Sequence, residues 1–141
     1  MMVQGDVAIE VPPTLVRLEE VTLQLLGHPG GTMPNVVIFD VEDGMAHGIP
    51  LFKNHAVGVL MVYMSAGSLF KPHSHPNDEW VVVVEGSFLL YLDGKKDRVY
   101  RPGEAVRFKP DQIHSGRVGT ETPITRIVSI TVPADPSYPE P

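Results

Sequence analysis

The sequence predicts an all-β protein built as one domain. Its 141 residues fit a single domain of common size, and no internal repeat or low-complexity linker divides them. The 13 glycines and 14 prolines fall between short apolar runs, where turns are expected. Many of these runs are rich in valine and isoleucine, which favour strands. Together these observations indicate a series of short strands around one core.

Eight apolar runs are expected to be strands, because of their length and their β-branched content. They are residues 21–26, 36–41, 57–64, 80–85, 87–92, 105–109, 113–118 and 124–132. The longest apolar stretch, VGVLMVYM, is about a third of a membrane span and suits a buried strand. Asp93-Gly94 and Pro102-Gly103 have the residue types of tight turns between consecutive antiparallel strands.

The two ends of the chain are patterned differently from the middle. Leu15, Leu18, Val21, Leu25 and Leu26 fit one face of a short helix or two edge strands, and both alternatives stay open. The last nine residues, PADPSYPEP, contain four prolines and are expected to be extended and outside any central strand. Such a tail is suited to act as an arm on a partner.

The composition excludes several classes of protein. The 11 Lys and Arg against 17 Asp and Glu give a net charge of −6, which argues against binding nucleic acid. There is no cysteine, so disulfides, thiol nucleophiles and thiolate metal sites are excluded, and imidazole and carboxylate remain as metal ligands. No basic segment followed by a long apolar run stands at the N-terminus. We therefore expect no secretory signal, no membrane segment and a cytoplasmic location.

The most informative segment is GSLFKPHSHPNDEWVVVVEG, which begins at residue 67. His73 and His75 are two residues apart, so on a strand their side chains point the same way and present two imidazole nitrogens to one point. The next residues, Pro-Asn-Asp, are typical of a turn or bulge, after which Glu79 can return a carboxylate oxygen to that point. Three metal ligands are therefore expected from one hairpin.

His114 is the candidate for a fourth ligand from another strand, because one hairpin covers only one side of a coordination sphere. Imidazole with carboxylate suits one divalent ion of iron, manganese, nickel, zinc or copper. Three histidines and one glutamate leave open positions on a metal that prefers a higher coordination number. His28, His47 and His55 stand alone, and we expect them to be structural or exposed.

The segment resembles the first signature of the cupin superfamily. That signature is a glycine, five residues, His-x-His, three or four residues, a glutamate, six residues and a second glycine. Every element is matched here, at Gly67, His73, His75, Glu79 and Gly86. The resemblance covers roughly residues 57–132 and identifies the chain as a small single-domain cupin.

The second cupin signature is only partly kept. Gly103 and His114 stand at the expected separation, but the proline is displaced by one residue to Pro110. Asp111 stands where glycine is usual, and Val118 replaces an asparagine. We expect metal binding to be retained, while the geometry of the loop beside His114 and any role of the asparagine stay open.

The resemblance implies a jelly roll, a double-stranded β-helix in which two antiparallel sheets face each other and the metal lies inside one open end. Residues 36–132 would form this barrel, followed by the proline-rich tail at 133–141. Residues 1–35 would be an N-terminal extension that packs on the barrel or on a partner subunit. Small cupins of this type are commonly homodimers, so a homodimer is expected.

Strand alternation predicts the surroundings of the metal. Val81 and Val83 share the face of Glu79, whereas Trp80 points away from it. The candidates for an apolar lining are Val81, Val83, Tyr91, Val106 and Phe108. A largely apolar pocket around a metal favours a small organic ligand over a highly charged one.

The leading functional hypothesis is an enzyme that acts on a small oxygenated molecule, with one metal ion held by His73, His75, Glu79 and His114. Dioxygenation is the first subtype. Redox-neutral isomerase or lyase chemistry is the second, with Glu79 as the candidate base. The alternative is a non-catalytic module that binds or senses a small ligand.

Overall fold

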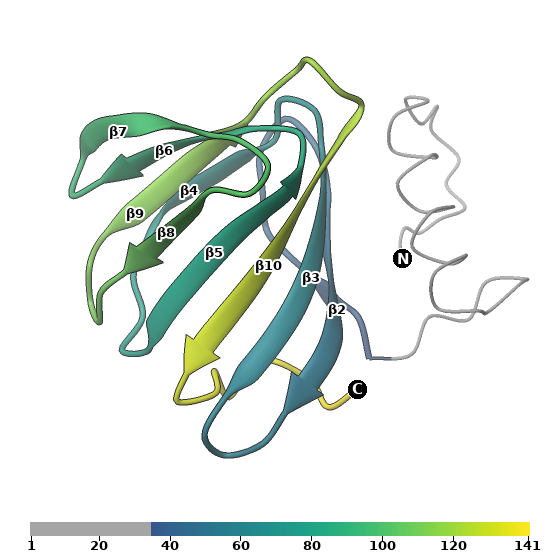
Figure 1. Ribbon diagram of the computed structural model, residues 1–141, viewed down its shortest axis with the longest axis vertical. Helices are drawn as coiled ribbons and strands as arrows, with labels where there is room; N and C mark the ends of the chain where they lie inside the picture. The colour runs from purple at the N-terminus through teal and green to yellow at the C-terminus, as the bar shows by residue number, and fades with distance from the viewer. Residues whose placement is uncertain (1–34) are drawn as a thin grey trace, which may run out of the picture.

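The computed structural model describes residues 35–141, and in this range the chain forms ten strands and no helix (Figure 1). The strands are β1 (Val37–Ile38), β2 (Ala46–Lys53), β3 (Gly58–Ser65), β4 (Leu69–His73), β5 (Asp78–Glu85), β6 (Phe88–Leu92), β7 (Lys95–Tyr100), β8 (Ala105–Phe108), β9 (His114–Val118) and β10 (Ile124–Val132). The expected strand at 21–26, His28 and residues 1–34 of the N-terminal extension lie outside the described residues.

The strands form two antiparallel sheets that face each other (Figure 1). The order is β1-β2-β3-β10-β5-β8 in the six-stranded sheet and β4-β9-β6-β7 in the four-stranded sheet. The predicted all-β jelly-roll architecture is therefore confirmed.

The core lies between the sheets and is filled by alternate residues of their strands. On β3, Leu60, Val62 and Met64 are no more than 2% exposed and pack in the same apolar cluster as Phe88 and Leu90 of β6. The continuous apolar run at 57–64, which the sequence predicts as a buried strand because of its length, is therefore confirmed as β3.

Three strands were missed by the sequence prediction, and each departs from the apolar pattern for a physical reason. Strand β7, KKDRVY, is the edge of its sheet, where charged side chains remain in water. Strand β2 contains Gly48 and Pro50, and its pairing with β3 shifts in register after Pro50. Strand β4, LFKPH, is short and largely exposed. Conversely, the strand expected at 36–41 is only the two-residue β1.

The two predicted turns are present, but they have different roles. Asp93 and Gly94 have φ values of 53° and 78° and join β6 to β7 as the hairpin that the sequence predicts. Pro102-Gly103 also turns the chain, with φ of 88° at Gly103. The strands on either side of it, β7 and β8, belong to different sheets, so the expected pairing of consecutive strands is wrong there.

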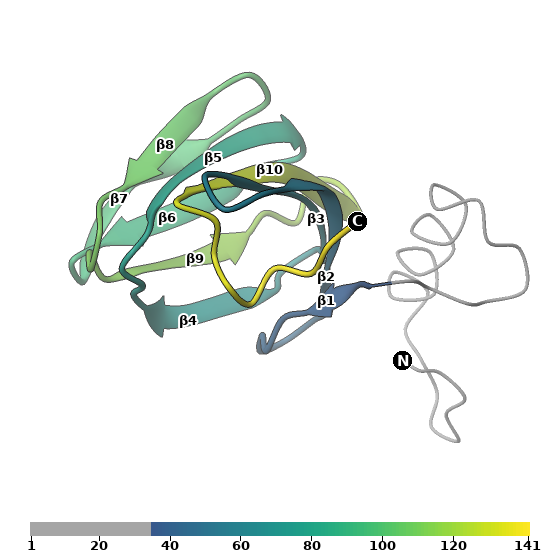
Figure 2. The same cartoon turned by 90° about the horizontal axis from the view of Figure 1, so that it is seen from below.

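The proline-rich tail at 133–141 is outside the central strands, as expected. Its described contacts are with its own barrel, and its role as an arm on a partner stays a prediction. Tyr138 is buried, its carbonyl oxygen accepts a hydrogen bond from the Lys53 ammonium, and the side chain of Asn77 donates to the Pro133 carbonyl at 2.8 Å. The tail thus crosses the opening between the two sheets (Figure 2).

Residues 35–141 include no helix that is long and apolar enough to cross a membrane.

Alanine at Gly86 should destabilise the protein more than alanine at Gly103. Both glycines have left-handed backbone, with φ of 85° and 88°, where an L-residue costs about 1–2 kcal/mol. An added Cβ at Gly103 meets nothing within 4 Å, whereas at Gly86 it would lie 2.9 Å from the backbone Cα of Thr125. Urea unfolding should show a loss of about 1 kcal/mol for Gly103→Ala and at least about 3 kcal/mol for Gly86→Ala. Equal losses would contradict this account of the turn.

Candidate metal centre

The predicted ligands come from a crossing between the two sheets rather than from a hairpin. His73 is the last residue of β4, His75 lies in the loop that follows, and Glu79 is the second residue of β5. Because β4 and β5 belong to different sheets, the expectation that one hairpin supplies three ligands is wrong. The three residues instead lie along a loop that crosses from one sheet to the other at the open end of the barrel.

His114 is the first residue of β9, and it pairs directly with His73 of β4. The predicted fourth residue therefore does come from a neighbouring strand. The loop that leads into His114 is held to the loop that carries His75, because the backbone N–H of Asp111 donates to the His75 carbonyl oxygen at 2.7 Å.

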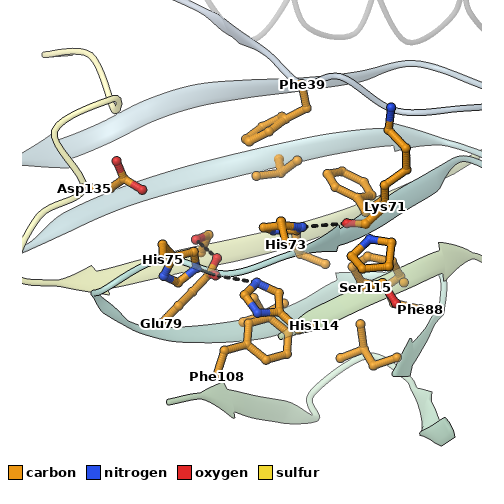
Figure 3. A pocket seen from close by; sticks show the side chains of 18 of the residues that line it. Phe39, Lys71, His73, His75, Glu79, Phe88, Phe108, His114, Ser115 and Asp135 are labelled. Carbon is orange, nitrogen blue, oxygen red and sulfur yellow. Dashed lines mark hydrogen bonds and ion pairs between the residues drawn. The ribbon is translucent and has the colours of Figure 1, made fainter. Parts of the chain in front are cut away.

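Three of the four side chains converge on one point. One ligand atom from each of His75, Glu79 and His114 lies within 4.8 Å of the others, an arrangement that can hold a metal ion. His75 Nε2 is 2.9 Å and His114 Nε2 is 3.7 Å from Glu79 Oε1, and Figure 3 shows these side chains pointing toward one another. His73 lies beside them, with its ring centroid 4.3 Å from that of His114, but outside the three-residue cluster. Its role as a ligand stays a prediction.

The three imidazoles are oriented in the same way by the backbone. The Nδ1 atom of each ring lies within hydrogen-bond distance of a carbonyl oxygen two residues away. These contacts are His73 to Lys71 at 2.7 Å, His75 to Asn77 at 3.1 Å and His114 to Gln112 at 2.9 Å. A carbonyl oxygen only accepts, so each Nδ1 carries a proton and Nε2 is the nitrogen available to bind a metal.

His114 shows most directly that the residues fit a metal. Its Nε2 is buried without a hydrogen-bond partner, and in the described part of the chain only the two ring nitrogens of His47 share this condition. A buried polar atom without a partner is costly and calls for an explanation. Its ring stacks on Phe108, with centroids 4.0 Å apart and planes at 9°, which fixes the direction of the nitrogen. A metal ion between this atom, His75 and Glu79 would supply the missing partner.

The electrostatics of the cluster differ from one histidine to the next. The hydrogen bond from His75 to the Glu79 carboxylate raises the pKa of His75 above its ordinary value. Burial, in contrast, lowers the pKa of His114. A proton on His75 therefore competes with a metal for Nε2, whereas His114 offers its lone pair to a metal more readily.

The loop beside His114 has left-handed backbone at the position where the second signature has a glycine. Asp111, which stands at the glycine position, has φ of 63°, in the left-handed region that aspartate tolerates better than most residues. The conformation that glycine usually provides is thus retained. Val118, which replaces the asparagine, is buried in the core and contributes no polar group.

Two residues near Glu79 were missed by the sequence prediction. The Ser129 hydroxyl donates to Glu79 Oε2 at 2.6 Å and lies 2.8 Å from the Tyr138 hydroxyl. Burial raises the pKa of Tyr138 well above its ordinary value, so this hydroxyl is protonated at neutral pH. The sequence offers a weak indication of Ser129, because it is a small polar residue on the inward face of an apolar strand. It offers none of Tyr138, which lies in the proline-rich tail.

A cavity of about 380 Å³ opens onto the cluster. Its apolar walls include the predicted Val81 and Phe108. Val83 and Val106 are buried in the core without lining it, and Tyr91 does not line it either. Trp80 points away from the cavity, as predicted, and is 37% exposed. In Figure 3, Phe39 and Phe88 lie across the cavity from Glu79.

The histidines that were not expected to be ligands do not contribute to the site. His47 is fully buried on β2, and burial lowers its pKa to about 4. His55 is exposed in the turn between β2 and β3. Neither lines the cavity.

The fold and the donor set define a small β-barrel with an imidazole and carboxylate centre at one open end. The family model described as "Cupin domain" matches residues 59–131, which is more than half of the chain. The protein therefore belongs to the cupin family, and the resemblance seen in its sequence is confirmed.

Several solved structures share this fold. KdgF from Halomonas sp. is 24% identical, with a TM-score of 0.62 over 71% of this chain and 88% of that one. An RmlC-like cupin from Shewanella frigidimarina is 21% identical, with a TM-score of 0.63 over 77% and 94%. The Cnp3 cupin domain of Schizosaccharomyces pombe is 14% identical, with a TM-score of 0.59 over 74% of each chain. A comparison with curated proteins found no match.

The histidines of the metal-free protein should titrate in a fixed order. NMR titration of the imidazole protons should give His75 a pKa above 6.5 and His114 a pKa below 6.5, with His47 at about 4. Glu79→Gln removes the charged acceptor and should lower the pKa of His75 while leaving that of His47 unchanged. An unchanged pKa of His75 in this variant would mean that the two side chains do not interact as described.

Proposed function

We propose that this cupin is a metal-dependent enzyme that dioxygenates a small organic molecule with a largely apolar skeleton and two oxygen substituents close enough together to bind one metal ion. One observation carries the proposal. The donor atoms of His75, Glu79 and His114 border a cavity of about 380 Å³ whose other walls are mainly apolar. Such a site binds apolar carbon while it leaves a polar centre for the substrate oxygens.

One divalent transition metal ion per chain would be held by His75, Glu79 and His114, with His73 as a further ligand. Iron, manganese, nickel, zinc and copper all accept this donor set. When bound, such an ion supplies either redox chemistry with dioxygen or Lewis-acid polarisation of a substrate oxygen. In dioxygenation both atoms of dioxygen end in the organic product, so no external reductant is needed.

The rest of the chain binds the substrate and excludes water. Phe39, Phe70 and Phe88 pack in a row, with successive ring centroids 5.8 Å apart, and all three line the cavity. An aromatic wall of this kind favours a flat or branched apolar skeleton.

The acid and base groups of the cavity outside the donor set are already engaged. The Asp135 carboxylate accepts from the backbone N–H and hydroxyl of Ser137, and the Lys71 ammonium lies 3.4 Å from the Asp40 carboxylate. Neither group is free of a partner to act as the base of a proton shift, and for this reason we place dioxygenation first.

Redox-neutral isomerase or lyase chemistry is the second candidate. One observation favours it. Glu79 Oε1 already lies at hydrogen-bond distance, 2.9 Å, from the ring nitrogen Nε2 of His75, so Glu79, once it leaves the metal, can take up a proton and return it to a substrate carbon.

We also propose a homodimer in the cytoplasm. The outer face of the six-stranded sheet exposes Trp80, Val84 and Val132 by 37–42% on the paired strands β5 and β10. Exposed apolar side chains on neighbouring strands favour burial against a second copy, to which residues 1–35 are expected to contribute. Sedimentation equilibrium should give the mass of two chains, and the mass of one chain would contradict the dimer.

The reaction is tested by oxygen uptake. Protein loaded with iron(II) should consume dioxygen with at least one member of a panel of catechols, β-diketones and α-hydroxyketones. Mass spectrometry after reaction in ¹⁸O₂ should find two labelled oxygens in the product. His75→Ala and Glu79→Gln should lower the uptake by at least about 100-fold. Loss of a group that only hydrogen-bonds to a metal ligand already costs about 10–100-fold, and these two changes remove the ligands themselves.

The matched control is His55→Ala, which removes an exposed imidazole outside the cavity and should retain full activity. Consumption of a panel member without oxygen uptake would contradict dioxygenation and support the redox-neutral reaction. If no panel member is consumed with any of the five metals, the enzymatic proposal fails and a binding or sensing module is the better interpretation.

A further inference from the structure

The C-terminal segment, residues 133–141, forms part of the metal centre's surroundings. After β10 it turns back and crosses the opening between the sheets (Figure 2). Asp135, Ser137 and Tyr138 line the cavity, and Tyr138 is the only residue of this segment that is buried. A segment with four prolines in nine residues is therefore ordered by contacts at the site itself.

The first of these contacts reaches Glu79 through Ser129. Glu79 Oε2 only accepts, so the single hydroxyl proton of Ser129 is directed to it, at 2.6 Å. The Ser129 oxygen then accepts from the Tyr138 hydroxyl, 2.8 Å away. Ser129 and Tyr138 are buried, and the Glu79 side chain is 12% exposed. The tail thus fixes one carboxylate oxygen and leaves Oε1 directed at the imidazoles.

The second contact reaches His75 through Asn77. Asn77 is 5% exposed, and its side-chain amide donates to the carbonyl oxygen of Pro133 at 2.8 Å. The backbone carbonyl oxygen of Asn77 lies 3.1 Å from His75 Nδ1 and fixes the tautomer of that ring. Two of the converging side chains are therefore held by residues that also hold the tail.

We propose that Tyr138 is a positioning residue for the metal centre, and that docking of the C-terminal segment and metal binding stabilise each other. The proposal rests on the metal centre of the proposed function but not on the reaction. Hydrogen bonds to the ligands of a metal commonly contribute 10–100-fold to its affinity. Coupling between two sites is reciprocal, so a metal that binds more tightly with the tail docked must also hold the tail more firmly.

Tyr138→Phe tests the proposal because it removes only the hydroxyl and keeps the ring that packs in the core. Titration with Mn²⁺ and with Zn²⁺ should show about tenfold weaker binding than the wild-type protein. Ser129→Ala, which removes the direct hydrogen bond to Glu79, should weaken binding at least as much.

Tyr100→Phe is the matched control. The Tyr100 hydroxyl donates to a carboxylate, that of Asp97, at 2.6 Å, and its side chain is 7% exposed. It lies on β7 of the four-stranded sheet and does not line the cavity. This variant loses a comparable hydrogen bond and should bind both metals as the wild type does.

Hydrogen exchange at the backbone amides of Asp135, Ser137 and Tyr138 gives a second readout. Metal should slow exchange at these amides in the wild type, and by a larger factor than it does in Tyr138→Phe. Faster tail exchange in Tyr138→Phe with unchanged metal affinity would overturn the proposal, because the hydroxyl would then only pack the tail. Failure of the wild type to bind either metal would overturn both this proposal and the metal centre.

Discussion

Each sheet can bury its apolar face only against the other sheet, and this constraint determines where the candidate site lies. The chain must cross repeatedly between the two sheets, and one crossing is the short loop between β4 and β5. His75 lies in that loop, His73 and Glu79 flank it, and His114 pairs with His73 from β9. The polar cluster therefore forms at the edge of the core, where the barrel is open.

A second constraint orients the side chains of the cluster, because polar groups that are removed from water need hydrogen-bond partners. Each imidazole uses Nδ1 on a nearby carbonyl oxygen, and Glu79 uses Oε2 on Ser129. The remaining atoms, the Nε2 nitrogens and Oε1, are left to face one another. The carbonyl partners belong to Lys71 of β4, to Asn77 of the crossing loop and to Gln112 of the loop before β9. The backbone at the open end of the barrel therefore orients the donor atoms.

Much of this arrangement can be predicted from the sequence, but only where the signal is local. The spacing of His73, His75 and Glu79 predicts convergence, because side-chain direction follows from strand geometry. It does not reveal that the chain changes sheets at this point, since the sheet that a strand joins depends on distant pairings. Ser129 could have been noticed as a polar residue in an apolar strand. Tyr138 could not, because its burial depends on where the tail returns.

The central claim is that these side chains bind a metal ion, and elemental analysis tests it most directly. Purified protein, produced in medium supplied with several transition metals, should carry about one equivalent per chain. The same content is expected for His55→Ala, whereas His114→Ala, which removes the buried nitrogen without a partner, should lose it. A wild-type protein free of metal, or a His114→Ala variant that retains its metal in full, would contradict the account.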